Sequence, residues 1–183
     1  MTDDLDLASR AALPADLLAL LEKFPRAKWP QAPGFHGLAS FWLDKHLGFR
    51  ALLNGLRTDA EAAHDGKLSG ERWKQRMSGL GGRLINELVG HHQIEDDAYF
   101  PQMLRLERRL ARGFDILDRD HHALDAMIAE FVAGANTALG AKDARNAAGR
   151  FHTALAPFER QLVRHLEDEE DLIIPVILKH RMG

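Results

Sequence analysis

Apolar residues recur every three or four positions along most of the chain, the spacing that places side chains on one face of a helix. No segment shows the period-two alternation of a strand. Four long helices are predicted: from Phe35 to a loop at about 59–70, from Ser69 or Ser78 to Phe100, over 112–139, and over 142–172. Four long helices with short connections favour an all-α class and an antiparallel up-down four-helix bundle.

Glycine and proline mark the ends and the weak points of these helices. Gly140 is a suitable terminator for the third helix. The three glycines within 79–82 each cost up to about 1 kcal/mol relative to Ala, so they either permit close helix packing or mark the true start of the second helix. Pro101 predicts a stop or kink at the end of that helix, and Pro157 predicts a kink or break in the fourth.

A short N-terminal region precedes the four long helices. Residues 15–24 follow Pro14, which suits a helix start, and their amphipathic pattern predicts a short helix that packs on the main body. Three prolines within 25–34 then form an irregular connector, because proline lacks an amide donor. We therefore divide the chain into residues 1–34, an N-terminal helix with a Pro-rich connector, and residues 35–183, the four-helix bundle.

Composition limits the chemistry and the partners. The 183 residues suit one domain and include no Cys, so disulfides, iron–sulfur clusters and thiolate metal sites are excluded for the chain acting alone. The net charge of −3 supplies no cationic surface, so neither nucleic acid nor a membrane is expected as a partner. The acidic N-terminus is unlike a secretory signal, and no apolar run approaches a membrane span. We expect a soluble, cytoplasmic protein.

One phrase of metal-ligand residues occurs twice, at residues 91–97 (HHQIEDD) and 165–171 (HLEDEED). Each copy is an HxxxE followed by further acids, with a proline ten residues after the His. Another His precedes each copy at nearly equal distance, His46 by 45 residues and His121 by 44. The chain therefore looks like a duplicated helical hairpin whose repeated residues are ligand types.

The spacing within each phrase brings two ligand types together. Residues four apart lie on one face of a helix, so His91 with Glu95, and His165 with Glu169, each present an imidazole and a carboxylate to one point. The two upstream His complete four His and two Glu from four helices. The predicted metal ligands are His46, His91, Glu95, His121, His165 and Glu169.

The duplication also predicts how the ligands divide between two ions. If each hairpin holds one ion, His46 and His91 bind the first, His121 and His165 bind the second, and the two Glu bridge both. Imidazole and carboxylate ligands with open positions suit iron, with Mn or Zn as substitutes. We expect two iron ions joined by an oxo or hydroxo bridge, with a position open to a diatomic molecule or water.

Several neighbours of these ligands have alternative roles. His92 and His122 lie about 100° around the helix from the ligand face, so we place them beside the site rather than in it. Trp42 and Phe49 flank the first-helix His and form apolar walls of the site or ordinary core. Tyr99 lies one turn past the first Glu, where it can hydrogen-bond a bound ligand, donate an electron, or simply pack.

The remaining acids and histidines receive no role in the site. The acid runs at 96–97 and within 167–171 are expected to form solvated faces rather than a route for metal. Four further histidines have no partner in the repeat and are expected at the surface or in ordinary packing: His36, His64, His152 and His180.

The doubled phrase with its upstream His resembles the hemerythrin-like HHE cation-binding domain over about residues 35–178. The resemblance implies an up-down bundle around a non-haem di-iron centre, with the family's ligands on the six residues above. Two positions differ from oxygen-carrying hemerythrins. Asp125 stands where they have a fifth His, and is expected to orient an imidazole or to be a weak further ligand. Their last motif is HxxxxD, whereas this chain has Glu169, with Glu170 as its rival.

The four-His, two-Glu set is more similar to di-iron proteins linked to iron–sulfur-cluster repair and nitric oxide metabolism, whose Cys-bearing N-terminal domain has no counterpart in residues 1–33. We expect a protein that binds or senses O2 or NO at a di-iron centre. The alternatives are a di-iron redox enzyme (oxidase, peroxidase-like or NO-reducing) and an iron donor for cluster repair. These alternatives require an electron donor or an iron-acceptor protein, and the sequence does not determine the oligomeric state.

Overall fold

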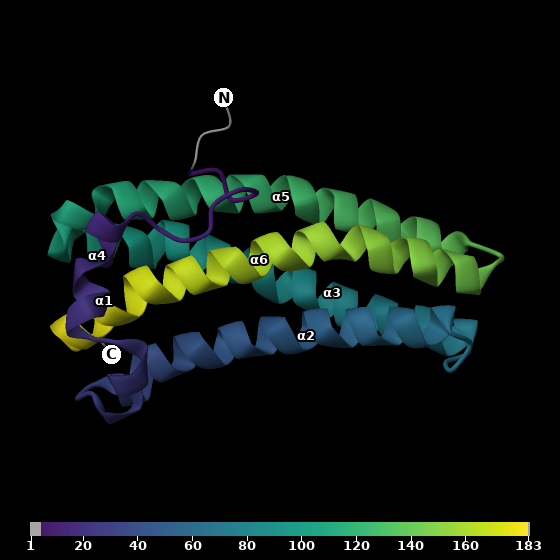
Figure 1. Cartoon of the computed structure of the whole chain (residues 1–183), viewed down its shortest axis with the longest axis horizontal. Coiled ribbons are helices and arrows are strands. Elements are labelled where there is room, and N and C mark those ends of the chain that lie inside the picture. The colour runs from purple at the N-terminus through teal and green to yellow at the C-terminus, as the bar shows by residue number, and fades with distance from the viewer. Residues whose placement is uncertain (1–4, 183) are drawn as a thin grey trace.

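Four long helices lie side by side along the molecule (Figure 1). The structure is a computed structural model that describes residues 5–182. Its α-helices are α1 (Ala19–Lys23), α2 (Ser40–His64), α3 (Gly70–Ile94), α4 (Phe100–Leu106), α5 (Ala111–Gly140) and α6 (Ala144–His180). α2 packs against α3 and α6, and α5 packs against α3 and α6. The described residues contain no strand, so the predicted all-α class and up-down bundle are confirmed.

A side-chain cap fixes where α3 begins. The Ser69 hydroxyl accepts a hydrogen bond from the backbone amide of Arg72, so α3 starts at Gly70, the earlier of the two predicted starts. The loop before α3 is shorter than predicted because α2 continues to His64. The glycines at 79–82 lie inside α3. A Cβ added to Gly81 would lie 3.2 Å from the Phe131 ring, so this glycine allows α3 to approach α5 closely.

The prolines disturb the helices less than the sequence predicts. Pro101 does not end the second helix, because a wider π-type turn at Glu95–Tyr99 leads directly into α4. Proline lacks the amide that a regular helix would require at this position, and the wider turn accommodates the missing bond. Pro157 does not break the fourth helix either, since α6 runs unbroken to His180, eight residues past the predicted end at 172.

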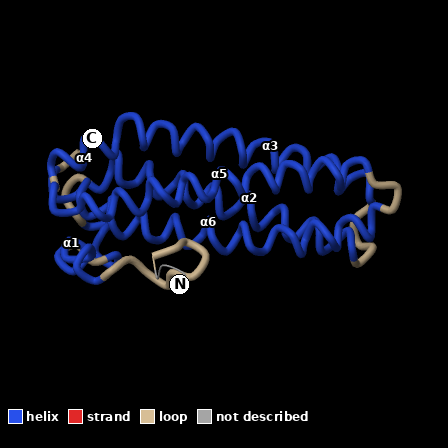
Figure 2. Tube along the Cα trace, turned by 90° about the horizontal axis from the view of Figure 1, so that it is seen from above, coloured by secondary structure: helices blue, strands red, loops and turns tan. Residues whose placement is uncertain are grey.

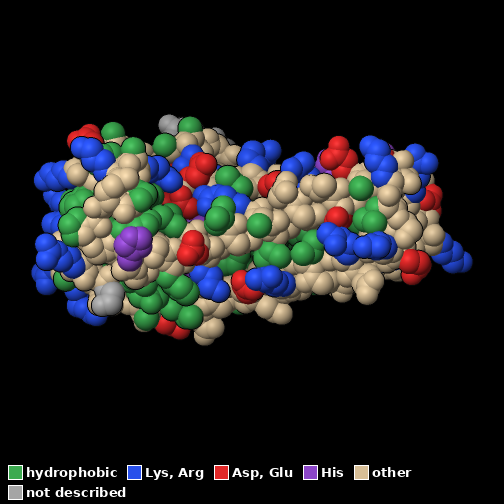
Figure 3. Space-filling view, turned by 90° about the horizontal axis from the view of Figure 1, so that it is seen from below, with side chains coloured by type: hydrophobic (Ala, Val, Ile, Leu, Met, Phe, Trp, Pro, Cys, Tyr) green, Lys and Arg blue, Asp and Glu red, His purple; other side chains and the backbone are tan. Residues whose placement is uncertain are grey.

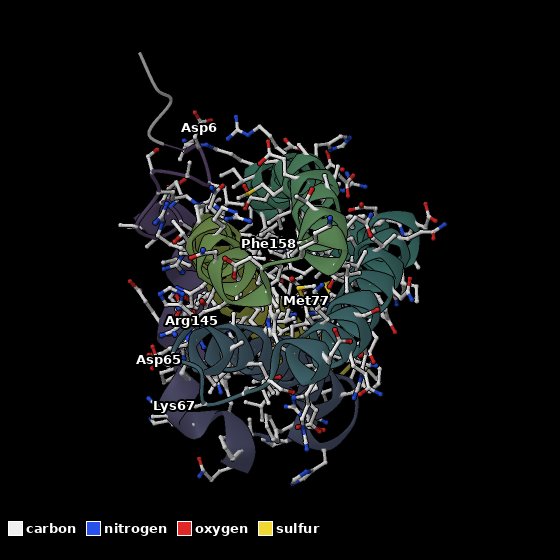
Figure 4. The ribbon with its side chains drawn as sticks, turned by 90° about the vertical axis from the view of Figure 1, so that its right-hand side faces the viewer. Asp6, Asp65, Lys67, Met77, Arg145 and Phe158 are labelled. Carbon is white, nitrogen blue, oxygen red and sulfur yellow. The ribbon has the colours of Figure 1, made fainter. Side chains whose placement is uncertain are left out.

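Two apolar clusters fill the bundle, one toward each end. The first contains Met77 and Phe158, which lie in the middle of the bundle when it is seen end-on (Figure 4). The second lies near α1 and α4. Along α5, Leu117 belongs to the second cluster, Leu124 belongs to the first, and buried His121 lies between them. In α2 the change falls at buried His46, between Trp42 and Phe49, and in α6 it falls between Leu166 and Leu172, across the buried acids 168–170 that follow His165. A polar layer therefore separates the two apolar clusters.

The N-terminal segment, residues 5–34, lies along one side of the bundle beside α6 (Figure 2), and its short helix packs on the main body as predicted. It consists of short turns and α1, and the connector itself contains a 3-10 helix at Arg26–Gln31. Leu17, Leu20 and Trp29 are buried in the second apolar cluster. The segment is therefore anchored by apolar contacts on the half of the bundle that contains α4. Among the described residues, no helix has the length and apolar character that crossing a membrane would need.

Candidate metal centre

The six residues predicted as metal ligands lie together in the polar layer, and His92 lies with them. They form two groups, and within each group the candidate ligand atoms are no more than 4.8 Å apart. The first group is His46, His91, Glu95 and Glu169, and the second group is His92, His121 and His165. The side chain of His91 is 12% exposed, and the other six side chains are buried.

In the first group, two imidazoles and two carboxylates face a common point. The Nε2 atoms of His46 and His91 lie 3.1 Å apart. His91 Nε2 lies 2.8 Å from Glu95 Oε1, although the pair lacks the angles of a hydrogen bond. His46 Nε2 lies 3.5 Å from Glu169 Oε2. Four atoms with lone pairs therefore converge from three segments of the bundle.

In the second group, three imidazole rings pack together. The ring of His92 stacks on His121 with centroids 4.0 Å apart, and it meets His165 edge-on at 5.4 Å. Each glutamate also reaches this group. Glu95 Oε2 lies 3.5 Å from His121 Nε2, and Glu169 Oε2 lies 3.4 Å from His165 Nε2. Glu95 and Glu169 therefore lie between the two groups and face both.

His92, which is predicted to lie beside the site, lies inside it. In a four-helix bundle each helix has two neighbours, and α3 faces α2 on one side and α5 on the other. Consecutive residues point about 100° apart, so His91 reaches toward α2 while His92 reaches toward α5. Burial lowers the pKa of His92 well below its ordinary value, so the ring is neutral. The His91–His92 doublet was the signal that could have identified this residue.

Three further carboxylates, which we call the outer carboxylates, hold the imidazoles from behind. They are Glu170, Asp96 and Asp120. The Nδ1 atom of His46 lies 3.0 Å from Glu170, that of His121 lies 2.9 Å from Asp96, and that of His165 lies 3.4 Å from Asp120. If each Nδ1 donates its proton outward, each Nε2 keeps its lone pair and faces the centre. This arrangement is the one that metal-binding histidines commonly have.

These contacts bear on three predictions. Asp125 is exposed and near exposed His122, so Asp96 and Asp120 orient the imidazoles in its place. Glu170 contacts the rear of an imidazole, while Glu169 faces both groups. The second acid run is not a solvated face, because Asp168 is 1% exposed and Glu170 is 3% exposed. The four histidines without a partner in the repeat also lie outside the two groups: His36, His64, His152 and His180.

The electrostatics of the two groups are uneven. Burial, opposed only in part by Glu169, lowers the pKa of His91 to about 4, so this imidazole is neutral at pH 7. Burial would also lower the pKa of His165, but Asp120 and Glu169 outweigh it and raise that pKa to about 9. Burial and the nearby Glu169 carboxylate raise the pKa of Glu95 well above its ordinary value. A cation between the groups would relieve the repulsion between the two glutamates.

Buried polar atoms without hydrogen bonds test whether a metal fits here. These atoms in the two groups are both ring nitrogens of His92, Nε2 of His121 and of His165, both carboxylate oxygens of Glu95, and Oε2 of Glu169. A buried polar atom left unpaired costs about 1–3 kcal/mol. Imidazole nitrogen and carboxylate oxygen are ligands for iron and related ions, and one or two cations would give these atoms a common partner. The residues therefore fit a metal centre.

A pocket of about 330 Å³ opens between α2 and α3 and reaches His91 and Glu95. Its wall includes Trp42 and Tyr99, whose ring centroids are 5.0 Å apart. The indole N–H of Trp42 donates to Glu169, so one ring both lines the pocket and holds a candidate ligand. We call this the access pocket. Hydrophobic side chains are also exposed on the α2 side of the molecule (Figure 3).

Comparison with protein families gives a match over well over half of the chain. The family model described as "Hemerythrin HHE cation binding domain" matches residues 37–177. This range includes all seven residues of the two groups, the outer carboxylates and the access pocket. Searches of curated proteins and of solved structures give no match.

Proposed function

The chain belongs to the hemerythrin HHE cation-binding family, and from this premise we propose that it holds two iron ions and binds or senses O2 or NO. The observation that carries the proposal is the position of the two glutamates. Glu95 has one oxygen 2.8 Å from His91 and the other 3.5 Å from His121. Carboxylates that face two groups of imidazoles are suited to joining two ions, one in each group.

The two groups would supply different ligand sets. The first group offers two imidazoles and the second offers three, and both share Glu95 and Glu169. Two bound iron ions would supply redox change and a coordination position for a small neutral ligand. The protein would hold each imidazole in one tautomer through an outer carboxylate. Manganese or zinc would fit the same donor atoms.

The access pocket supports binding of a small ligand at the first group. His91 is the one exposed imidazole among the seven residues, and it lies in the pocket wall with Glu95. Trp42 is 2% exposed and Phe49 is fully buried, so the rings around this group limit the access of water. A small ligand would therefore reach the centre from the α2–α3 side.

A redox enzyme is the second candidate, and Tyr99 favours it. The tyrosine lines the access pocket beside Trp42 and lies one turn from Glu95. Its hydroxyl is a group that can donate a proton, and the adjacent rings can pass an electron to a molecule in the pocket. Such an enzyme would need an electron donor. Iron donation to another protein is less well supported, because six of the seven candidate ligands are buried.

The test is the iron content and optical spectrum of the protein loaded under anaerobic conditions, recorded before and after O2 or NO. Two irons per chain, with a charge-transfer band that forms and reverses with O2 without turnover, support ligand binding. Rapid oxidation with peroxide consumption supports the enzyme. Glu95→Ala and Glu169→Ala should each remove most of the iron, whereas His36→Ala and His64→Ala should not. A single tightly held ion in the wild-type protein would contradict the dinuclear centre.

A further inference from the structure

An arginine from the N-terminal segment is buried against two carboxylates of the bundle. The side chain of Arg10 is 1% exposed. Its Nη2 atom lies 2.5 Å from Asp120 Oδ2, and its Nε atom donates to Asp168 Oδ2 at 2.8 Å. Nη1 also donates to the Leu5 carbonyl at 2.6 Å. A buried arginine with two buried carboxylates forms an ion pair that is costly to break, because each partner left alone would be an uncompensated charge.

A single side chain, that of Asp120, separates this arginine from the candidate metal ligand His165. Asp120, which it contacts, is the outer carboxylate of His165, and its Oδ2 atom lies 3.4 Å from the imidazole Nδ1. The same Asp120 oxygen therefore faces a guanidinium on one side and a candidate metal ligand on the other. The position and the basicity of Asp120 depend on Arg10, and the orientation of the imidazole depends on Asp120.

A second arginine of the segment makes the corresponding contact on the other group. Arg26 Nη1 donates to Glu170 Oε2 at 2.7 Å, and its Nε atom donates to Asp171 at 2.6 Å. The other oxygen of Glu170 lies 3.0 Å from Nδ1 of His46 and accepts a hydrogen bond from Arg50 at 2.7 Å. Glu170 is thus the outer carboxylate of the first group. One of its oxygens is held by the N-terminal segment and the other by the bundle.

We propose that the N-terminal segment positions the ligands of the metal centre, with one arginine for each group. Arg10 acts through Asp120 on the second group, and Arg26 acts through Glu170 on the first group. The segment lies outside the matched family region, which begins at residue 37. The proposal rests on the two-ion centre proposed above and assigns a role to a part of the chain that is otherwise only a covering for one side of the bundle.

Each arginine affects its imidazole in two ways, through the basicity of the outer carboxylate and through the position of that carboxylate. An outer carboxylate that accepts the Nδ1 proton makes the imidazole a more basic ligand. A guanidinium on the same carboxylate withdraws part of that effect and also fixes the carboxylate in place. Removing the arginine should therefore make the carboxylate a stronger acceptor but leave it free to move. We expect the loss of position to dominate, so that the electronic environment of one ion changes and its retention weakens. Loss of an outer partner of a metal ligand typically changes metal affinity about 10–100-fold.

Mössbauer spectroscopy of the iron-loaded full chain can separate the two groups. They differ in their number of imidazoles, so two distinguishable doublets are expected. Arg10→Gln should shift one doublet and leave the other unchanged, and Arg26→Gln should shift the other one. In a chelator assay, each variant should lose its first iron at least about tenfold faster than wild type. Arg10→Lys and Arg26→Lys keep the positive charge and should restore most of the wild-type behaviour.

A matched control separates positioning from simple attachment of the segment. Arg112 of α5 lies 3.8 Å from Asp16 of the segment, and both side chains are more than half exposed. Arg112→Gln removes this ion pair, which involves no outer carboxylate. It should therefore leave both doublets and the iron release rate unchanged. If Arg10→Gln did not fold, Arg10→Lys and the more exposed Arg26→Gln would still carry the test.

Two results would overturn the proposal. If wild type held two irons but both Gln variants had its doublets and release rates, the arginines would have no positioning role. If Arg10→Gln, Arg26→Gln and Arg112→Gln all changed both doublets alike, the segment would act only through general stability. A wild-type protein with fewer than two irons would instead contradict the proposed function itself.

Discussion

Gly90 gives a direct way to test whether the access pocket admits the ligand. It lies in the pocket wall on α3, one residue before His91, and a Cβ added there would meet no atom within 4 Å. Gly90→Leu therefore introduces a side chain into open space rather than into a packed core. A leucine side chain has roughly the volume of three waters at about 30 Å³ each, which is near a quarter of the pocket.

The expected effects on binding and on stability have opposite signs. Replacing a helical glycine with leucine should stabilise α3 by up to about 1 kcal/mol, or raise Tm by about 2–4 °C for a chain of this size. Narrowing the pocket in this way should slow association of O2 or NO at least about tenfold. This is equivalent to about 1.4 kcal/mol on the activation barrier for association. Slower binding to a more stable protein cannot be explained by partial unfolding.

Stopped-flow measurement of O2 or NO association with the iron-loaded protein provides the assay. The matched control is Gly82→Leu, because Gly82 lies on the same helix, also has open space at its Cβ, and does not line the pocket. The control should gain stability and bind at the wild-type rate. Wild-type association in Gly90→Leu, with unchanged iron content, would refute the route through this pocket.

Three further predictions concern other parts of the chain. His92→Leu should weaken retention of one ion about tenfold or more, measured by iron content, while exposed His122→Leu should not change it. Trp42→Phe removes the indole donor to a candidate ligand. It should lower the unfolding free energy of the metal-free protein by about 1–3 kcal/mol, measured as a lower Tm. Burial would raise the pKa of Glu107, but its cationic partners in the last turn of α6 outweigh burial and lower that pKa to about 2. The stability gained from this group is therefore present above about pH 4.5 and is lost as the pH falls toward 2. Glu107→Gln should remove this part of the acid dependence in thermal melts.

Periodicity and local spacing predicted the parts of the fold that depend on neighbours in sequence. The four long helices, their order and the short N-terminal helix follow from the apolar pattern and were confirmed. At the two prolines, local rules predicted more disruption than occurs. Before Pro101 a single wider turn separates α3 from α4 and accommodates the missing amide, and Pro157 lies inside α6 without breaking it.

The candidate site was predictable where it depended on repetition and was not predictable where it depended on position in the bundle. The HxxxE spacing brings His91 together with Glu95 on one helix face, as expected. His92 was excluded because it points about 100° away, yet α3 has two neighbouring helices and this direction leads to α5. Helical geometry gives the angle between two side chains, but only the arrangement of helices shows what each one faces.

The acid runs show the same limit over a longer distance. Asp168 and Glu170 were expected in solvent because short runs of charge usually lie on exposed faces. Their partners include Arg10 and Arg26, which are 158 and 144 residues away in the sequence. No local pattern connects residues so far apart. These charges are paired only because the fold brings the N-terminal segment beside α6.

The position of the polar layer explains how the bundle can contain it. Buried histidines and glutamates without partners are unfavourable, and each unpaired atom costs about 1–3 kcal/mol. Apolar clusters on both sides of the layer hold the same four helices together independently of it. Burial of apolar side chains contributes about 1.5–3 kcal/mol for each large residue, so the clusters can offset the cost of the layer. The packing of the two clusters can thus position the helices that carry the ligands, so this task does not fall to the metal alone.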